Sequence, residues 1–540
     1  MDAKKGMLWT ILKWIGRAVF AAFILTLIYF QAPIKVIAFF SIFLLAGIFL
    51  KKRHYQYFWF LVLFAVCCGA VWVFLPEDDN GWVPFAFEKD IQALNDKYAV
   101  PDSENAALIY NEIFAEYTAK DLDPNLTDEA DIDTMDNPWT AEKYPQLAEW
   151  IKTKEPLIEK LKQAAEKEKC FFEIKQDLNL DMDSLSLFRK FSYLLVRKAN
   201  NDIANGNIDA AIADLSIPIQ IAKHVYQQPV IVDYLVAISI DSLSKLHFNE
   251  ILVRQKLTDE QYNKIAVILE KNRFSWDDSL ERVLGFERLY LKNLLPGMLY
   301  ETKDGKYRFT RDHWKAIQML NPEMEQPESK YPYWRKKAVK VATIFAWFVL
   351  PSTPDSLTNR IDTIFDEYII SRKMPEYKFK LRYENGLDRM VSRYFEVYEK
   401  IALLSNKWQD DRYGSLLVLE ISKFKNKNGN WPQSLDELGT AGIPLERFIY
   451  KPIDEANFIL YSIGENGIDD GGKGEAGCRN SDCEKYDDIL IWPRRQAELD
   501  KLNINTPPQT DQIPAEVLIP ENPGANMRPA GMPGSVEANK

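Results

Sequence analysis

The apolar residues follow two patterns along the chain, continuous runs before residue 76 and helical spacing after it. The third of the continuous runs has 21 residues without a charge, enough for a helix to cross about 30 Å of hydrocarbon. The second run is long enough to cross the membrane only if residues 31–35 form a very tight turn. The alternative is that the first and second runs form a re-entrant pair. We expect residues 1–78 to form a membrane anchor with three spans, at about 8–34, 35–50 and 55–75.

Residues 79–397 show the periodicity of amphipathic helices separated by polar breaks. The clearest unit spans residues 184–271, where a turn at Asn205-Gly206-Asn207 separates two helices. Later in this unit, Thr258 followed by Gln261 has the spacing of a capping box at a helix start. Helices joined by short turns pack as antiparallel neighbours. The region is therefore predicted to be a mainly α domain of antiparallel helix pairs.

A small α+β domain is expected over residues 398–497, after the helical region. It begins with a helix, and short strands are predicted at Phe448–Tyr450 and Phe458–Ser462. The segment Asp487–Trp492 closes the loop that follows the second strand. Residues 498–540 are predicted to be a disordered tail, because they are rich in proline and poor in large apolar side chains.

Charge differs sharply between the two parts of the chain. Residues 1–75 carry eight basic residues against one acid, and the remainder carries 59 basic against 77 acidic residues, a net charge of −18. Basic flanks stay on the cytoplasmic side of a membrane. We therefore expect a multi-pass protein of the inner (cytoplasmic) membrane with a cytoplasmic N-terminus and an extracytoplasmic bulk. The acidic bulk should repel phosphates, so nucleic acid is not an expected partner.

The polar loop from Gly464 to Gly472 is the best candidate for chemistry, since it combines glycines with Asp469 and Asp470. Glycines allow the backbone to adopt positive φ angles. Carboxylates and carbonyls that converge on one point suit a hard cation such as Ca²⁺. The spacing is not that of an EF-hand, and the alternative is a solvated surface loop that is acidic for solubility.

Cys478 and Cys483 lie in the same loop, with four residues between them. Outside the cytoplasm this pair could close a local disulfide, and free thiols are the alternative. A zinc site would need two more ligands, yet no other cysteine is near and no histidine follows His313. We expect a Cys478–Cys483 disulfide.

The C-terminal module carries a run of short motifs, namely Lys427–Pro432, Leu435–Leu438, Leu460–Gly467 and Asp487–Ile489 with Trp492. Through these motifs, residues 410–492 resemble the globular domain of the major pseudopilin of type II secretion systems. In that family the loop holds a structural calcium ion. The resemblance implies that Asp469 or Asp470, together with Asp487 or Asp488, supplies side-chain ligands to Ca²⁺, helped by loop carbonyls.

The chain departs from the pseudopilin pattern at its N-terminus. A pseudopilin has a short leader, a cleavage site and a glutamate at the fifth mature position, and residues 6–11 contain no such glutamate. We therefore do not expect this chain to polymerise as a pilin. Segments such as Glu104–Ala107 and Gly206–Ala211 also give the whole chain a resemblance to uncharacterised envelope proteins of planctomycete-type bacteria. That resemblance implies an architecture but no activity.

The sequence contains no phosphate loop, zinc-protease helix, nucleophile elbow or dinucleotide fingerprint. This favours a non-enzymatic role over an enzymatic one. We expect an extracytoplasmic scaffold or interaction protein with a calcium-stabilised pseudopilin-like module, associated with a secretion or envelope assembly. Its expected partners are the lipid bilayer and a protein of the envelope. The alternative is an extracytoplasmic hydrolase that uses carboxylates in a groove of the helical domain.

Overall fold

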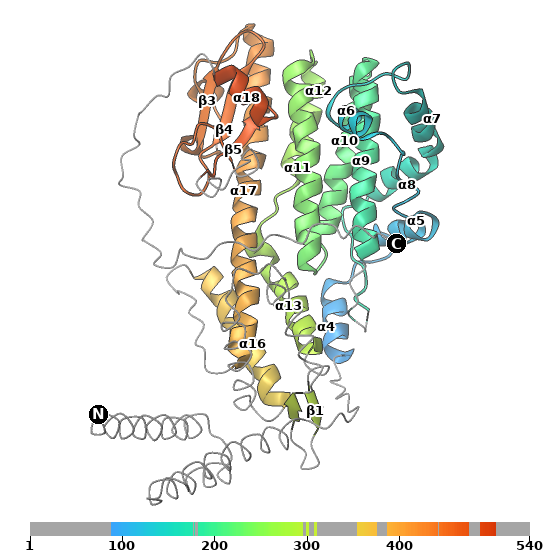
Figure 1. The fold of residues 1–540 in the computed structure, drawn as a ribbon, viewed down its shortest axis with the longest axis vertical. Coiled ribbons are helices and arrows are strands. Elements are labelled where there is room, and N and C mark those ends of the chain that lie inside the picture. The colour runs from blue at the N-terminus through green and yellow to red at the C-terminus, as the bar shows by residue number, and fades with distance from the viewer. Residues whose placement is uncertain are drawn as a thin grey trace, which may run out of the picture.

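A computed structural model of the chain describes residues 88–175, 178, 182–294, 299–301, 307–309, 354–374, 386–440, 442–474 and 486–503. These residues are mainly helical and form an elongated body (Figure 1). The body begins with α4 (Glu88–Tyr98), α5 (Ala107–Glu116), α6 (Asp128–Asp136), α7 (Pro145–Thr153), α8 (Glu155–Ala165), α9 (Met182–Ala204), α10 (Ile208–Tyr226), α11 (Ile231–Arg254), α12 (Asp259–Lys271) and α13 (Trp276–Leu294). It continues with α16 (Pro354–Lys373) and with α17 (Gly386–Asn428), which runs along most of its height.

Local signals in the sequence explain where several of these helices begin. The turn between α9 and α10 lies at the predicted position, and Gly206 adopts a φ of 76° there. The capping box of α12 is confirmed. The Gln261 backbone N–H donates to the Thr258 hydroxyl at 3.2 Å, and the Thr258 backbone N–H donates to the Gln261 side chain at 3.0 Å. Both devices satisfy backbone groups that a helix end leaves unpaired.

Helices α9, α10 and α11 form the centre of the body, and their apolar faces contribute to two cores. The first core extends to α5, α8, α13, α16 and the N-terminal half of α17. The second core joins α9–α12 to the C-terminal half of α17 and to the C-terminal module. Burial of this much apolar surface is the main driving force that holds the module against the helices.

The C-terminal module contains a three-stranded antiparallel sheet beside the C-terminal half of α17 (Figure 1). Its strand order is β3 (Phe448–Pro452), β4 (Phe458–Ser462) and β5 (Ile489–Trp492), with Tyr450 opposite Leu460 and Leu460 opposite Trp492. Two 3₁₀ helices, η3 (Leu435–Leu438) and η4 (Leu445–Arg447), precede the sheet. A separate two-stranded ribbon pairs β1 (Leu299–Glu301) with β2 (Tyr307–Phe309).

Strand β4 is buried along its whole length, because a helix covers each face of the sheet. Phe458 and Leu460 pack in the core shared with α17, whereas Ile459 and Tyr461 pack with Leu499 of α18 (Gln496–Asn503). This explains why β4 reads as a continuous apolar run rather than as an alternation.

Close packing of β5 on α17 depends on a glycine of the helix. A Cβ atom on Gly414 would lie 2.5 Å from the Cδ1 atom of Ile491, which is too close for any side chain. The helix therefore presents bare backbone at the point where β5 crosses it. Helix α17 continues without a break from residue 386 through residue 428, so the helical body and the sheet share this element.

Two parts of the predicted fold class need correction. Within the described part of the chain, every helix is too short or too polar to cross a lipid bilayer, so the predicted three-span anchor is not supported. Even the 24-residue α11 carries charged residues along its length. The runs 8–34, 35–50 and 55–75, on which that prediction was made, lie outside the described residues. The predicted tail also starts too early, because α18 continues to Asn503 with Leu499 fully buried.

Candidate functional site

The acidic loop between β4 and β5 is shaped by glycines that have no room for a side chain. Gly464 has a φ of 66°, and a Cβ atom there would collide with the backbone carbonyl of Asp487. At Gly472, which has a φ of 77°, a Cβ atom would lie 2.8 Å from the Leu499 side chain of α18. These contacts fold the loop back so that its two ends meet beside the sheet.

Asp487 acts as a brace for this loop. One carboxylate oxygen, Oδ2, accepts the backbone N–H groups of Glu465 at 2.7 Å and Asn466 at 3.3 Å. The other oxygen, Oδ1, lies 2.7 Å from the Lys407 ammonium on α17. Burial alone would raise the pKa of Asp487, but Lys407 and the loop N–H groups hold it below its usual value.

Asp488 differs from Asp487 in having an oxygen without a partner. Its Oδ2 atom accepts the backbone N–H groups of Asp470 at 2.9 Å and Gly472 at 2.8 Å. Its Oδ1 atom is buried and has no hydrogen-bond partner among the described residues. The residue is only 4% exposed, and burial raises the pKa of Asp488 to about 7. A buried carboxylate oxygen without a donor is unfavourable unless a proton or a cation compensates it.

The other two predicted ligands complete the loop. Asp469 accepts the Tyr461 hydroxyl at 2.8 Å and the Gly471 N–H at 2.9 Å. Asp470 accepts the Asp487 N–H at 3.2 Å. Hydrogen bonds thus connect Asp470, Asp487 and Asp488, whereas Asp469 bonds to Tyr461 and Gly471. The described residues contain no group of three or more acidic, cysteine or histidine side chains arranged to hold a metal. Cys478 and Cys483 lie outside the described residues, so their disulfide stays a prediction.

A cavity of about 590 Å³ is lined by residues of α5, α9, α11, α13 and the segment 172–175. The residues that line it are mainly apolar and include four phenylalanines, Phe114, Phe172, Phe188 and Phe286. A volume of this size is typical of sites for small molecules.

Four side-chain amides hold segment 170–175, which has no regular secondary structure, as one wall of the cavity. Asn105 bonds both the N–H and the C=O of Phe171, at 3.0 and 2.9 Å. Asn95 does the same for Ile174, at 2.9 and 3.1 Å. Gln228 bonds the Phe172 N–H and the Cys170 C=O, and Gln227 accepts the Cys170 N–H. These bonds replace the ladder that a strand would supply.

Asp233 is the one buried charged residue among the described residues that line the cavity, and it is 8% exposed. Burial raises the pKa of Asp233 to about 7, and the nearby Glu287 carboxyl shifts it in the same direction. Glu287 is buried behind the cavity wall and accepts the Ile231 N–H at 3.4 Å. The described residues place no cation in an ion pair with either carboxyl, which leaves excess negative charge beside an apolar space.

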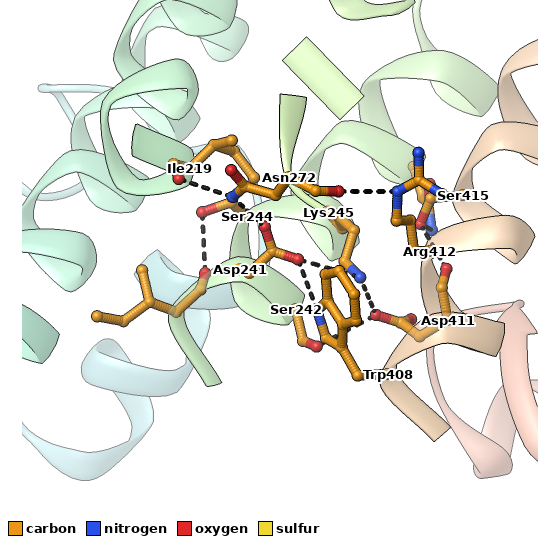
Figure 2. A network of polar contacts seen from close by, with 12 residues as sticks. Ile219, Asp241, Ser242, Ser244, Lys245, Asn272, Trp408, Asp411, Arg412 and Ser415 are labelled. Atoms are coloured by element: carbon orange, nitrogen blue, oxygen red, sulfur yellow. Dashed lines mark hydrogen bonds and ion pairs between the residues drawn. The ribbon is translucent and has the colours of Figure 1, made fainter. Parts of the chain in front are cut away.

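Figure 2 shows a second set of buried polar groups, which joins α11 to α17. The Lys245 ammonium lies 3.2 Å from Asp241 and 2.7 Å from Asp411, and 4.7 Å from the centre of the Trp408 ring. Asp241 also accepts the Trp408 indole N–H at 2.8 Å and the Asn272 amide at 2.8 Å. The set is completed by Arg412, Ser242 and Ser415.

This network is neutral overall, since two cations face two carboxylates. Lys245 is 2% exposed, and no residue of the network lines the 590 Å³ cavity. Lys245 and Asp241 are therefore bonded within the network and buried, and among its charged groups only Asp411 is partly exposed. We interpret the network as a structural clamp between the two helices rather than as a reaction centre.

The histidines that the sequence places on helices are also internal. His224 accepts the Tyr110 hydroxyl at Nδ1 (2.9 Å) and donates from Nε2 to the Lys167 carbonyl (2.8 Å). Burial lowers the pKa of His224 to about 4 and that of His247 to about 3, so both are neutral at physiological pH. His224 is neutral, hydrogen-bonded and buried, which is typical of a core histidine rather than of a general base; the buried Nε2 atom of His247 has no hydrogen-bond partner among the described residues.

Sequence reasoning missed the Asp233 cavity and the α11–α17 clamp. The signal for both is in α11, where Asp233, Asp241 and Lys245 interrupt an otherwise apolar helix. A charged residue on an apolar face must find a partner or a cavity when the helix is buried. Comparison with protein-family models, curated proteins and solved structures finds no match to this chain.

Proposed function

We propose that this chain is a non-catalytic interaction protein whose C-terminal module is stabilised by a bound calcium ion. The observation that carries the proposal is the buried Oδ1 atom of Asp488, which has no hydrogen-bond partner among the described residues. It lies in a loop where Asp469 and Asp470 add negative charge. This charge shifts the pKa of Asp488 upward, in the same direction as burial.

A calcium ion would supply the missing compensation at this position. Asp488 would contribute a carboxylate oxygen, and Asp469 or Asp470 a second, with backbone carbonyls completing a set of oxygen ligands. Asp487 would keep its present role, because its two oxygens already bind loop N–H groups and Lys407. The ion would fasten the ends of the loop and so hold β5 against β4. Millimolar calcium outside the cytoplasm suits a weak structural site of this kind.

We expect calcium to raise the melting temperature of the full chain, by about 2–6 °C for a stabilisation of about 1–3 kcal/mol. The measurement is thermal unfolding followed by circular dichroism, with excess calcium, excess magnesium or a chelator. Asp488→Asn should abolish the calcium-dependent shift. Asp436→Asn, which changes an exposed aspartate of η3, is the matched control and should keep it. Equal melting temperatures of the unmodified chain in calcium and in chelator would refute the metal site.

The interaction role rests on exposed apolar side chains of α16 and α17. Ile370 on α16 and Met374, the residue just after the end of this helix, are 43% and 50% exposed. Val397 and Leu404 lie two turns apart on one face of α17 and are 50% and 36% exposed. Large apolar groups that repeat at helical spacing on a solvent face are typical of protein-binding surfaces.

The partner-binding role predicts a surface-specific loss of capture. Affinity capture with the full chain should recover a defined partner, and replacing both Val397 and Leu404 by glutamate should abolish its recovery. Val267→Glu on α12 is the control, because Val267 is the most exposed of the large apolar residues, at 72%. Recovery of no partner, or equal recovery with the α17 variant and the control, would contradict the role.

The hydrolase alternative needs two carboxyl groups that face one cavity. Asp233 and Glu287 are both buried, but Glu287 does not line the cavity, and Glu173 lies exposed at its rim. A single interior carboxyl does not form the acid–base pair that glycoside hydrolysis requires. The geometry therefore favours binding over hydrolysis at this cavity.

A further inference from the structure

The cavity beside Asp233 combines two features that together select a ligand. Its interior is lined by the rings of Phe114, Phe172, Phe188 and Phe286, which favour an apolar molecule. Its one buried charged residue in the described part of the chain is a carboxylate. The other charged residues of the lining, Glu173 and Lys175, are exposed at the rim and remain solvated.

The protein itself does not neutralise this carboxylate with an ion pair among the described residues. Arg282 is the cation that lowers the pKa of Asp233, against the larger effect of burial. Its guanidinium does not pair with the carboxylate but donates to the backbone carbonyls of Gln228 at 3.2 Å and Tyr226 at 2.7 Å. The guanidinium also lies over the Tyr226 ring, 5.0 Å from its centre. The second buried acid, Glu287, adds negative charge rather than removing it. Asp233 therefore keeps its capacity to bind a cation.

The wall that faces Asp233 is well ordered by its hydrogen bonds. Gln228, at the turn before α11, holds Phe172 and Cys170 through their backbone groups, and Asn105 holds Phe171. The aromatic wall and the carboxylate are thus fixed relative to each other, which lowers the entropy lost when a ligand is bound.

We propose that this cavity binds a small apolar molecule that carries one ammonium group, with the ammonium paired to Asp233 and the apolar part packed against the four phenylalanines. The negative faces of the aromatic rings attract an organic cation in addition to the carboxylate. An apolar carboxylate ligand is disfavoured, because Asp233 and Glu287 would repel it. A neutral apolar ligand would leave the Asp233 carboxyl uncompensated. This inference is independent of the calcium site, which lies in the C-terminal module.

The test uses three probes of equal length on the full chain, by isothermal titration calorimetry at pH 7.5: n-octylamine, n-octanol and n-octanoate. We expect n-octylamine to bind at least tenfold more tightly than n-octanol, the range of a charge-assisted hydrogen bond. We expect no measurable binding of n-octanoate. Equal affinities for the amine and the alcohol, tighter binding of octanoate, or no binding of any probe would overturn the proposal.

Two variants locate the binding in the cavity. Asp233→Asn keeps the shape of the side chain and should reduce the amine affinity at least tenfold, whereas Glu173→Gln makes the same charge change at the rim and should change it by less than about threefold. Val232→Phe fills the cavity without changing its charge and should abolish binding of both amine and alcohol, which keeps the test valid if Asp233→Asn does not fold. Amine binding unaffected by Asp233→Asn and by Val232→Phe would place the probe elsewhere and refute the site.

Discussion

Replacing Lys245 by alanine is expected to lower the free energy of unfolding by about 3–5 kcal/mol. Lys245 is 2% exposed, and its ammonium lies between the carboxylates of Asp241 and Asp411 on two different helices. Removal of Lys245 leaves Asp241 and Asp411 without their ion-pair partner, because Arg412, the other cation of the network, donates to the Asn272 carbonyl rather than to a carboxylate. The loss should exceed that of a typical core truncation, because an uncompensated buried charge is added to a cavity.

The measurement is chemical denaturation of the full chain, with Lys423→Ala as the matched control. Lys423 lies on α17 and pairs with Glu420 at 2.8 Å, but about a third of each side chain is exposed. Such a surface pair contributes about 0–1 kcal/mol. If Lys245→Ala and Lys423→Ala lose similar amounts, the buried network does not clamp α11 to α17.

A double-mutant cycle separates the charge from the packing. Asp241→Asn removes one negative charge and keeps one oxygen, which can accept from either Trp408 or Asn272 but not from both. Combined with Lys245→Met, it should destabilise the protein by at least about 1 kcal/mol less than the sum of the two single variants. An additive result would show that the two charges do not interact in the folded protein.

The sequence predicted the local elements of the fold better than their long-range contacts. The capping box at Thr258, the turn at Gly206 and the strand at Phe458–Ser462 depend on neighbouring residues, and each is present. Elements that depend on distant residues were not predictable in the same way. The helix at residues 496–503 has weak periodicity, and it is ordered by burial of Leu499 against Ile459 and Tyr461 of the sheet.

The candidate site shows the same division. The grouping of Asp469, Asp470, Asp487 and Asp488 in one loop was expected, but their different roles depend on partners that the pattern does not contain. Lys407, which lies far away in the sequence, engages Asp487 and leaves Asp488 as the acid with an unpaired oxygen. The Asp233 cavity is built from five separate segments of the chain, so the charge in α11 marks a buried acid but does not indicate which segments surround it.

Asn105 combines a local contact with a long-range one. Its Oδ1 atom accepts the Ala107 N–H at 3.0 Å, at the start of α5. The same side chain also bonds both backbone groups of Phe171, 66 residues away. Asn105 therefore connects the start of α5 to the irregular wall of the cavity.

We expect Asn105→Ala to lower the free energy of unfolding by about 2–4 kcal/mol, because it leaves two buried N–H donors and one buried carbonyl without partners. Denaturation of the full chain measures this loss. Asn428→Ala is the matched control, since Asn428 is exposed and makes one local bond to the Phe424 carbonyl at 3.0 Å. Its loss should stay below about 1 kcal/mol, and an equal loss in the two variants would mean that segment 170–175 does not depend on Asn105.

The location of the destabilised residues distinguishes a local brace of segment 170–175 from a general contribution of Asn105 to stability. In Asn105→Ala, amide hydrogen exchange should accelerate first at Phe171 and its neighbours, while exchange in β4 should be unchanged. The calcium-dependent rise in melting temperature should also persist, because the acidic loop belongs to the C-terminal module, whose sheet packs in the second core and not in the core that contains Phe188 and Tyr110. Amine binding, however, should weaken, since Phe172 would no longer be held opposite Asp233. Faster exchange spread evenly over both cores would instead show that Asn105 supports the whole body and that the cavity wall has no local brace.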